Sequence, residues 1–316
     1  MNKRTMMLDL AAGRATKGYT PAAFFLHFDE AHHRGQPAVD RHLEYFRATG
    51  MDFVKIQYEH PFPKLPQVKR PEDWAGVPVL GKDYFSDPLE VVSGIVKAAK
   101  KDAVIIVTLY SALMHASQAT SRELLTEHLR ADGPGTARGL MRIAESVLVF
   151  VRECVRRGVD GFYMSTQGGE AGRFPDASTF SRFIKPSDLL VMNEIQRTCA
   201  FNVLHVCDYH GEYEDLSPYA EYPGHLVNCG THLRSGAVTP KHLGSLFKRP
   251  FLGGMDRHGI LVKGTKEQIR AEVAAVLRDA PELFALGADC TVPSDIPLEN
   301  LKAAIDAAHG IGEATR

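Results

Sequence analysis

The sequence lacks the features that mark several broad classes of protein. Its 37 basic and 38 acidic residues leave a formal net charge of −1, so the composition does not indicate a nucleic-acid partner held through its phosphates. Five cysteines scattered through 316 residues are unlike a disulfide framework and fit a reducing compartment. Residues 1–14 show no secretory signal, and no apolar run approaches the ~20 residues of a membrane span. We therefore expect a cytoplasmic protein that acts on neither nucleic acid nor membrane.

Two nucleotide-binding motifs are also missing, since no GxGxxG follows an expected strand and no P-loop is present. Instead, apolar runs typical of buried strands alternate with segments of helical periodicity. The expected strands are residues 21–28, 51–58, 103–109, 159–165, 201–207, 225–228, 250–253 and 283–288. The expected helices are residues 38–49, 87–101, 121–157 with a break at 132–135, 176–199, 239–247, 266–279 and 297–309.

This alternation of eight strands with helices predicts an α/β fold, a (β/α)8 TIM barrel. We expect one catalytic domain at residues 19–316, preceded by an N-terminal helix or arm at residues 1–18. The alternative is a doubly wound open sheet, which normally has fewer repeats and a glycine-rich phosphate turn. In barrels of this kind the chemistry lies at the C-terminal ends of the strands.

Candidate metal ligands follow two of the expected strands. His205 and Cys207 are two residues apart, so on a strand they point to the same face. An imidazole and a thiol make half of a tetrahedral zinc site, and Cys290, at the end of another strand, offers a second sulfur. Cys229 is the main rival for the third position, and His210 is a weaker one. The alternative for Cys207 and Cys290 is burial as small core residues.

Other polar side chains fall at the expected strand ends and are candidates for catalysis or substrate binding. Carboxylates there would place a proton or bind substrate, or else would be solvated loop charges. An acid after two glycines often only caps a turn, and a histidine on an apolar strand is often a core residue. The candidates are His27, Gln57, Glu59, Tyr110, Glu170 and Asp256, with Asp208 as a partner that orients His205.

Three segments carry a resemblance to a known family. Leu204-His-Val-Cys207, Gly287-Ala-Asp-Cys290 and Pro297-Leu-Glu-Asn-Leu-Lys302 resemble the uroporphyrinogen decarboxylase superfamily, and within it the cobalamin-dependent methyltransferases. The similarity runs from about residue 40 to the end. It implies zinc held by His205, Cys207 and Cys290, and methyl transfer between a small molecule (a thiol, a methoxy compound or a methylamine) and a corrinoid protein that carries methylcobalamin. The direction of transfer stays open.

One departure from the family argues against a porphyrinogen substrate. The porphyrinogen decarboxylases have an N-terminal arginine that grips substrate carboxylates, but residues 21–29 contain none. The first alternative is a metal-free decarboxylase or lyase for a smaller acid, with Arg173, Arg234 and Arg257 as carboxylate partners. The second is a zinc-binding sensor or accessory subunit without activity.

A corrinoid partner would have to be a separate protein, because the expected barrel uses nearly all of the chain. The proline-rich residues 59–81, with the single tryptophan Trp74, are too long for a simple connection. We expect them to form either a docking surface or a lid over the pocket. Barrels of this size often dimerise, and a homodimer is possible.

Overall fold

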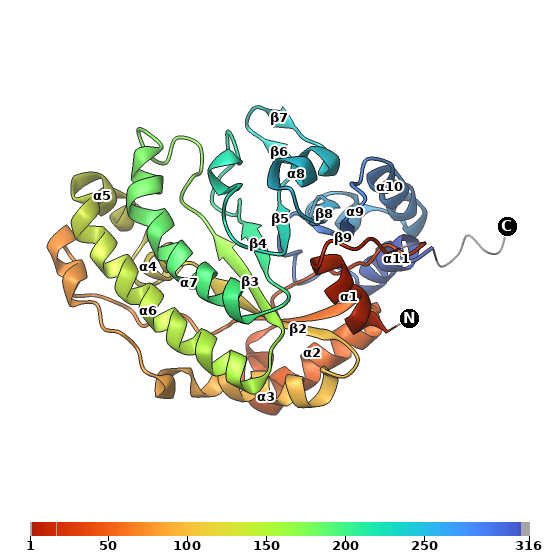
Figure 1. The fold of residues 1–316 in the computed structure, drawn as a ribbon, viewed down its shortest axis with the longest axis horizontal. Coiled ribbons are helices and arrows are strands. Elements are labelled where there is room, and N and C mark those ends of the chain that lie inside the picture. The colour runs from red at the N-terminus through yellow and green to blue at the C-terminus, as the bar shows by residue number, and fades with distance from the viewer. Residues whose placement is uncertain (1, 17, 311–316) are drawn as a thin grey trace.

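A computed structural model of the chain describes residues 2–16 and 18–310. Seven parallel strands form one curled sheet surrounded by helices (Figure 1). The strands follow one another around the sheet in the order in which they occur in the chain, as expected for strand–helix repeats. They are β1 (Phe53–Ile56), β2 (Val104–Tyr110), β3 (Gly161–Thr166), β4 (Val203–Val206), β5 (Leu226–Cys229), β8 (Phe251–Met255) and β9 (Phe284–Ala288).

The eighth position of the sheet is occupied by residues 21–28, but they do not form the expected strand. Only Ala22 bridges to β9, at Leu286, and the N–H of Asp52, just before β1, donates to the Ala22 carbonyl at 3.0 Å. Pro21 has no N–H to extend a ladder, and the carbonyl of Phe25 accepts from Val292 in the loop after β9. The segment therefore joins the two edges of the curled sheet, as a barrel requires, with few hydrogen bonds.

Helices cover the outside of the sheet, and the expected ones lie close to their predicted positions. Two short helices, α4 and α9, and a hairpin of β6 (His232–Leu233) and β7 (Gly236–Ala237) were not predicted. The helices are α1 (Lys3–Ala11), α2 (Gly35–Thr49), α3 (Ser86–Ala99), α4 (Ala112–Ala119), α5 (Arg122–Ala131), α6 (Gly133–Arg157), α7 (Lys185–Thr198), α8 (Pro240–Phe247), α9 (Ile260–Lys263), α10 (Lys266–Arg278) and α11 (Leu298–Ala308). In the described part of the chain, none of them combines the length and the apolar character needed to cross a membrane.

The N-terminal helix is packed into the fold, and the expected arm at residues 1–18 is not seen as a separate element. Helix α1 ends at Ala11, and its Met7 and Leu10 are fully buried. Arg4 pairs with Asp160, which precedes β3, so α1 lies near the N-terminal ends of the strands. Residues 1 and 17 of the expected arm lie outside the described residues.

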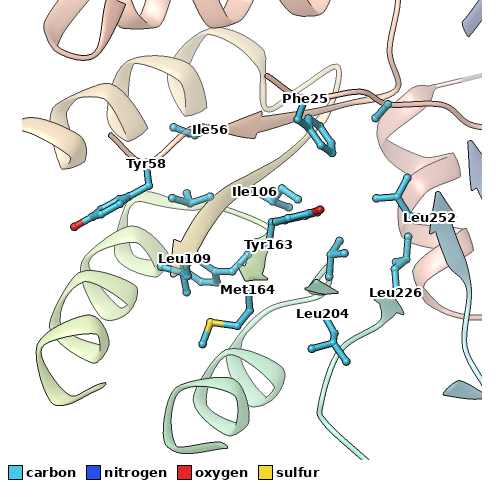
Figure 2. Close-up of a cluster of buried hydrophobic side chains, with 14 of the residues drawn as sticks. Phe25, Ile56, Tyr58, Ile106, Leu109, Tyr163, Met164, Leu204, Leu226 and Leu252 are labelled. Atoms are coloured by element: carbon cyan, nitrogen blue, oxygen red, sulfur yellow. The ribbon is translucent and has the colours of Figure 1, made fainter. Parts of the chain in front are cut away.

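The seven strands of the main sheet are buried except at Tyr110 and Gly254, which are partly exposed, as in parallel sheets covered on both faces. Figure 2 shows apolar side chains of successive strands gathered into one core, among them Ile56, Ile106, Leu204 and Leu226. Such strands read as continuous apolar runs, which is why the sequence pattern predicted them.

The expectation that Trp74 helps to form a docking surface is wrong. Its side chain is fully buried, and its indole N–H donates to Nδ1 of His128 at 3.0 Å. The ring packs against α6 so closely that a Cβ on Gly139 would lie 2.6 Å from it. The large apolar surface of the indole therefore holds the proline-rich segment onto α5 and α6.

A buried carboxylate ties the start of β1 to the two ends of the chain. Asp52 accepts hydrogen bonds from Ala22 N at 2.7 Å and Tyr19 Oη at 2.7 Å, and its other contact is His309 Nε2 at 2.8 Å. Burial by itself would raise the pKa of Asp52, but His309, with the hydrogen bonds from Ala22 and Tyr19, holds this pKa below its ordinary value. The charged form is therefore the one that the fold favours.

We expect Asp52→Asn to lower the free energy of unfolding by roughly 3 kcal/mol at neutral pH, as for a broken buried pair. Because the folded-state pKa is depressed, this contribution is present above the unfolded-state pKa and is lost as the pH falls through the folded-state value. Urea unfolding at several pH values measures both effects, with the exposed Asp295→Asn as control. An Asn variant with wild-type stability and acid dependence would contradict this role for Asp52.

Candidate metal centre

Three side chains from two strand ends meet on the inside of the sheet. His205 lies on β4, Cys207 is the first residue after β4, and Cys290 comes two residues after the end of β9. Their ligand atoms all lie within 4.8 Å of one another, and Cys290 Sγ is 3.3 Å from His205 Nε2. The rivals Cys229 and His210 are not part of this group. The structure thus brings together the three residues that the sequence analysis selected.

The imidazole of His205 is held by its neighbours in the sheet. The ring of Tyr163 on β3 stacks on it, with ring centres 5.0 Å apart. Tyr163 in turn donates from its hydroxyl to Asn228 Oδ1 on β5 at 2.5 Å. Because β3, β4 and β5 are adjacent in the sheet, the regular strand register fixes the plane of the His205 ring.

The two thiols share a hydrogen bond that separates their acidities. It lowers the pKa of Cys290 well below its ordinary value and raises that of Cys207. Gln167 Nε2 also contacts Cys207 Sγ at 3.4 Å. One of the two sulfurs is therefore readily available as a thiolate, the form that binds metal.

The donor set fits zinc. Ligand atoms around a tetrahedral zinc lie roughly 3.5 Å apart, given bonds of about 2.0–2.3 Å, and two soft sulfurs with one imidazole favour zinc over magnesium or calcium. The other ring nitrogen of His205, Nδ1, is buried without a hydrogen-bond partner among the described residues. The expected hydrogen bond from His205 to the Asp208 carboxylate is thus not formed, and Asp208 accepts from Arg257 instead.

Arg257 ties together the two loops that carry the cysteines. Its Nη1 donates to Asp208 Oδ1 at 2.7 Å and to Asp289 Oδ2 at 3.0 Å. Asp208 follows Cys207 in the chain, and Asp289 precedes Cys290. Burial raises the pKa of Asp289 to about 6, although the charge of Arg257 opposes the shift. One guanidinium therefore sets the spacing of the two sulfurs.

We expect Arg257→Met to weaken zinc binding by about 10- to 100-fold, the usual effect of losing a group that orients metal ligands. Competition with a chromophoric chelator measures the affinity, and near-ultraviolet circular dichroism checks the fold. Arg234→Met, in the exposed hairpin, is the control. Wild-type zinc affinity in Arg257→Met would show that the ion pairs do not position the cysteines.

The three residues line a cavity of about 590 Å³. Four of the expected catalytic or substrate-binding residues line it as well: His27, Gln57, Glu59 and Tyr110. His27 Nδ1 and Glu59 Oε1 are 2.6 Å apart, and Gln57 Nε2 donates to the Leu26 carbonyl at 2.6 Å. The cavity therefore combines the group of potential metal ligands with several groups that can bind or protonate a small molecule.

The other two expected residues, Asp256 and Glu170, do not line this cavity. Asp256 is exposed, and its carboxylate accepts from the N–H of His258 at 2.7 Å within its own turn. Glu170 is buried and pairs with Arg173 at 3.0 Å. The first caps a turn and the second is neutralised by a neighbour, so neither contacts the space that a substrate would fill.

The model of the family described as Uroporphyrinogen decarboxylase (URO-D) matches residues 38–311. The chain belongs to the uroporphyrinogen decarboxylase family. This confirms the family predicted from the motifs around Cys207, Cys290 and Pro297. A search of curated protein sequences finds no significant match.

Solved structures share the fold of this uroporphyrinogen decarboxylase family member at low sequence identity. A methyltransferase from Methanosarcina mazei is 17% identical, with 98% of each chain covered and a TM-score of 0.78. A B12-independent methionine synthase from Shewanella sp. W3-18-1, in complex with selenomethionine, is 11% identical, with 96% of this chain and 95% of that chain covered and a TM-score of 0.55. At such identities the likeness establishes the fold alone.

The cavity of this family member offers little to a substrate with many carboxylates. Of the three arginines considered for a lyase, only Arg257 lines the cavity, and two aspartates already neutralise it. Arg173 is buried in its ion pair with Glu170, and Arg234 is exposed in the β6–β7 hairpin. The cavity therefore suits a small ligand of low charge better than a porphyrinogen.

Sequence reasoning missed several cavity residues, among them Lys55 and Tyr163. A signal for Lys55 was present, because it lies inside the expected apolar strand 51–58, two residues before Gln57 and four before Glu59. That period of two places them on one face. A charged residue inside such a run is worth the same attention as a polar residue at its end.

Proposed function

We propose that this family member is a zinc-dependent methyltransferase that moves a methyl group between a small molecule and a corrinoid protein. The observation that carries the proposal is the group of His205, Cys207 and Cys290 in the wall of the cavity. Three protein ligands leave a fourth metal position for a substrate, as in catalytic zinc sites. The fold that the chain shares with a methyltransferase from Methanosarcina mazei supports the same activity.

The chain's own residues prepare this site for the reaction. His205, Cys207 and Cys290 would hold the zinc, which supplies a Lewis acid that lowers the pKa of a thiol or polarises a methoxy or amine group. Tyr163 fixes the plane of the imidazole, and Gln167 contacts the Cys207 sulfur. The substrate then meets ligands whose positions are already set, so little binding energy is lost in arranging them.

A second pair of side chains at the cavity, His27 and Glu59, can donate a proton to a bound molecule or accept one from it. The 2.6 Å contact between Nδ1 and Oε1 leaves Nε2 of His27 free to hydrogen-bond a small molecule. A methoxy or amine donor needs a proton on its leaving group after the methyl departs. A thiol acceptor needs none, so this pair matters mainly in the demethylating direction.

The corrinoid protein would dock over the C-terminal ends of the strands, where the cavity lies. The side chain of Tyr209, which lines the cavity, is 72% exposed and is available to such a partner.

All five cysteines are free, as we expect for the proposed cytoplasmic location. Homodimer formation remains a prediction.

The test is a methyl-transfer assay with free methylcobalamin in place of the corrinoid protein. Zinc-loaded protein is mixed with small thiols, and the loss of methylcobalamin absorbance is followed. We expect turnover that a chelator abolishes and added zinc restores. No transfer from methylcobalamin to any thiol and none from a methoxy or amine donor to cob(I)alamin, together with metal-independent decarboxylation of a small acid, would replace the proposal with the lyase alternative.

A further inference from the structure

A buried lysine lies in the cavity without an acidic partner. Lys55 on β1 is 5% exposed, and its Nζ donates to Gln57 Oε1 at 2.8 Å and to Thr108 Oγ1 at 2.9 Å. Within residues 2–16 and 18–310, no carboxylate forms a salt bridge with it, and Glu59, three residues after the end of β1, pairs with His27. Buried lysines are rarely left unpaired. The burial of Lys55 without an acidic partner therefore indicates a functional role.

The lysine is linked to the metal-ligand group through one aromatic ring. Its Nζ lies 4.8 Å from the ring centres of both Phe25 and Tyr163, which are neighbours in the core view (Figure 2). Tyr163 is also the ring that stacks on His205. The ammonium group is therefore one side chain away from the imidazole, in an interior where charges interact strongly.

The charges at the site depend on what occupies the fourth metal position. A zinc ion with two thiolates and a neutral imidazole has no net charge, and a methoxy or amine ligand leaves it so. A third thiolate adds one negative charge to a buried site, which is costly without a nearby cation. Among the lysine and arginine side chains of the described residues that line the cavity, Arg257 already faces two aspartates, whereas Lys55 has no salt-bridge partner.

We propose that Lys55 balances the negative charge of a substrate thiolate held beside Cys207 and Cys290, so that the small molecule of this enzyme is a thiol. This inference rests on the proposed function. Burial lowers the pKa of Lys55 to about 7, against the opposing charges of Cys290 and Glu59. In the free protein the lysine is therefore only partly protonated near neutral pH, and an anion bound nearby favours its charged form.

The test uses the cobalt(II)-substituted protein, in which a bound substrate thiolate adds to the sulfur-to-metal absorption band that Cys207 and Cys290 already give. One neutral thiol, 2-mercaptoethanol, and one acidic thiol, 3-mercaptopropionate, are titrated at about pH 8 while proton release is followed with an indicator dye. In Lys55→Met we expect about two- to threefold weaker binding of both thiols, because the effect of one charge at roughly 10 Å in a protein interior is partly offset by the cost of protonating, at about pH 8, a lysine whose pKa is about 7. The variant should release a full proton per thiol, whereas the wild type should release less, because Lys55 takes up part of it.

Controls separate this inference from simpler explanations. Lys55→Gln repeats the loss of charge with a polar side chain, and Lys266→Met removes an exposed lysine and should bind both thiols normally. Weakening confined to 3-mercaptopropionate would show that Lys55 binds the acid group of a substrate, and unchanged affinity and proton release would also overturn the inference. A wild-type protein that takes up no cobalt, or whose sulfur-to-metal band does not change with any thiol, would instead remove the proposed function and the inference with it.

Discussion

Replacing Cys290 with serine is expected to weaken zinc binding by roughly 100-fold or more and to abolish methyl transfer. Zinc binding to three or four protein ligands is worth about 10–16 kcal/mol, or roughly 3 kcal/mol per ligand, and a serine hydroxyl is a poor substitute for a thiolate. Cys290 also shares a hydrogen bond with Cys207, so its loss disturbs the remaining sulfur. Elemental analysis of protein dialysed against a weak chelator measures the effect.

The matched control is Cys229→Ser, which changes a buried cysteine on the neighbouring strand β5 that is outside the group. It should keep about one zinc per chain, whereas His205→Ala and Cys207→Ser should lose it as Cys290→Ser does. Full zinc content in Cys290→Ser, or loss of zinc in Cys229→Ser, would show that Cys290 is not the third zinc ligand.

Replacing Gly161 with alanine is expected to destabilise the protein by about 3 kcal/mol or more. A Cβ on this residue, at the start of β3, would lie 1.7 Å from the carbonyl oxygen of Phe201 and 2.4 Å from its carbonyl carbon. These are backbone atoms just before β4, so no side-chain rotation can relieve the overlap and the two strands must separate. Urea unfolding and soluble yield measure the loss.

The same substitution connects stability to the metal site. The strand that must move, β4, carries His205, so any Gly161→Ala protein that folds should also bind zinc more weakly. Gly76→Ala is the control, because nothing lies within 4 Å of its added Cβ. Equal stability of the two variants would mean that β3 and β4 adjust at little cost.

The regular part of the fold was predictable because strands buried on both faces form uninterrupted apolar runs. Residues 21–28 have the same pattern and yet form only a bridge at Ala22, since their partners are fixed by how the sheet closes. Helix α4 and the β6–β7 hairpin are short elements in loops. Tertiary contacts decide their conformation more than their own composition does.

The metal-ligand group was predictable because His205 and Cys207 have strand spacing and Cys290 ends another strand. Ion pairs were not predictable, because they join residues that are distant in the sequence. Asp208 forms an ion pair with Arg257 instead of a hydrogen bond with His205. Glu170 forms an ion pair with Arg173. Polar residues at strand ends therefore identify the right region of a barrel, but not which of them face the substrate.

The segment that closes the sheet also determines when the protein can finish folding during synthesis. Strands β1 to β5 each pair with the strand made just before or after them, so they can assemble while the ribosome is still at work. Ala22 must wait for Leu286, and Asp52 for His309, which at about 5–20 residues per second is a delay of roughly 10 to 50 s. Until then residues 21–28 lack their partner β9, and nascent chains are exposed to aggregation through this open edge of the sheet.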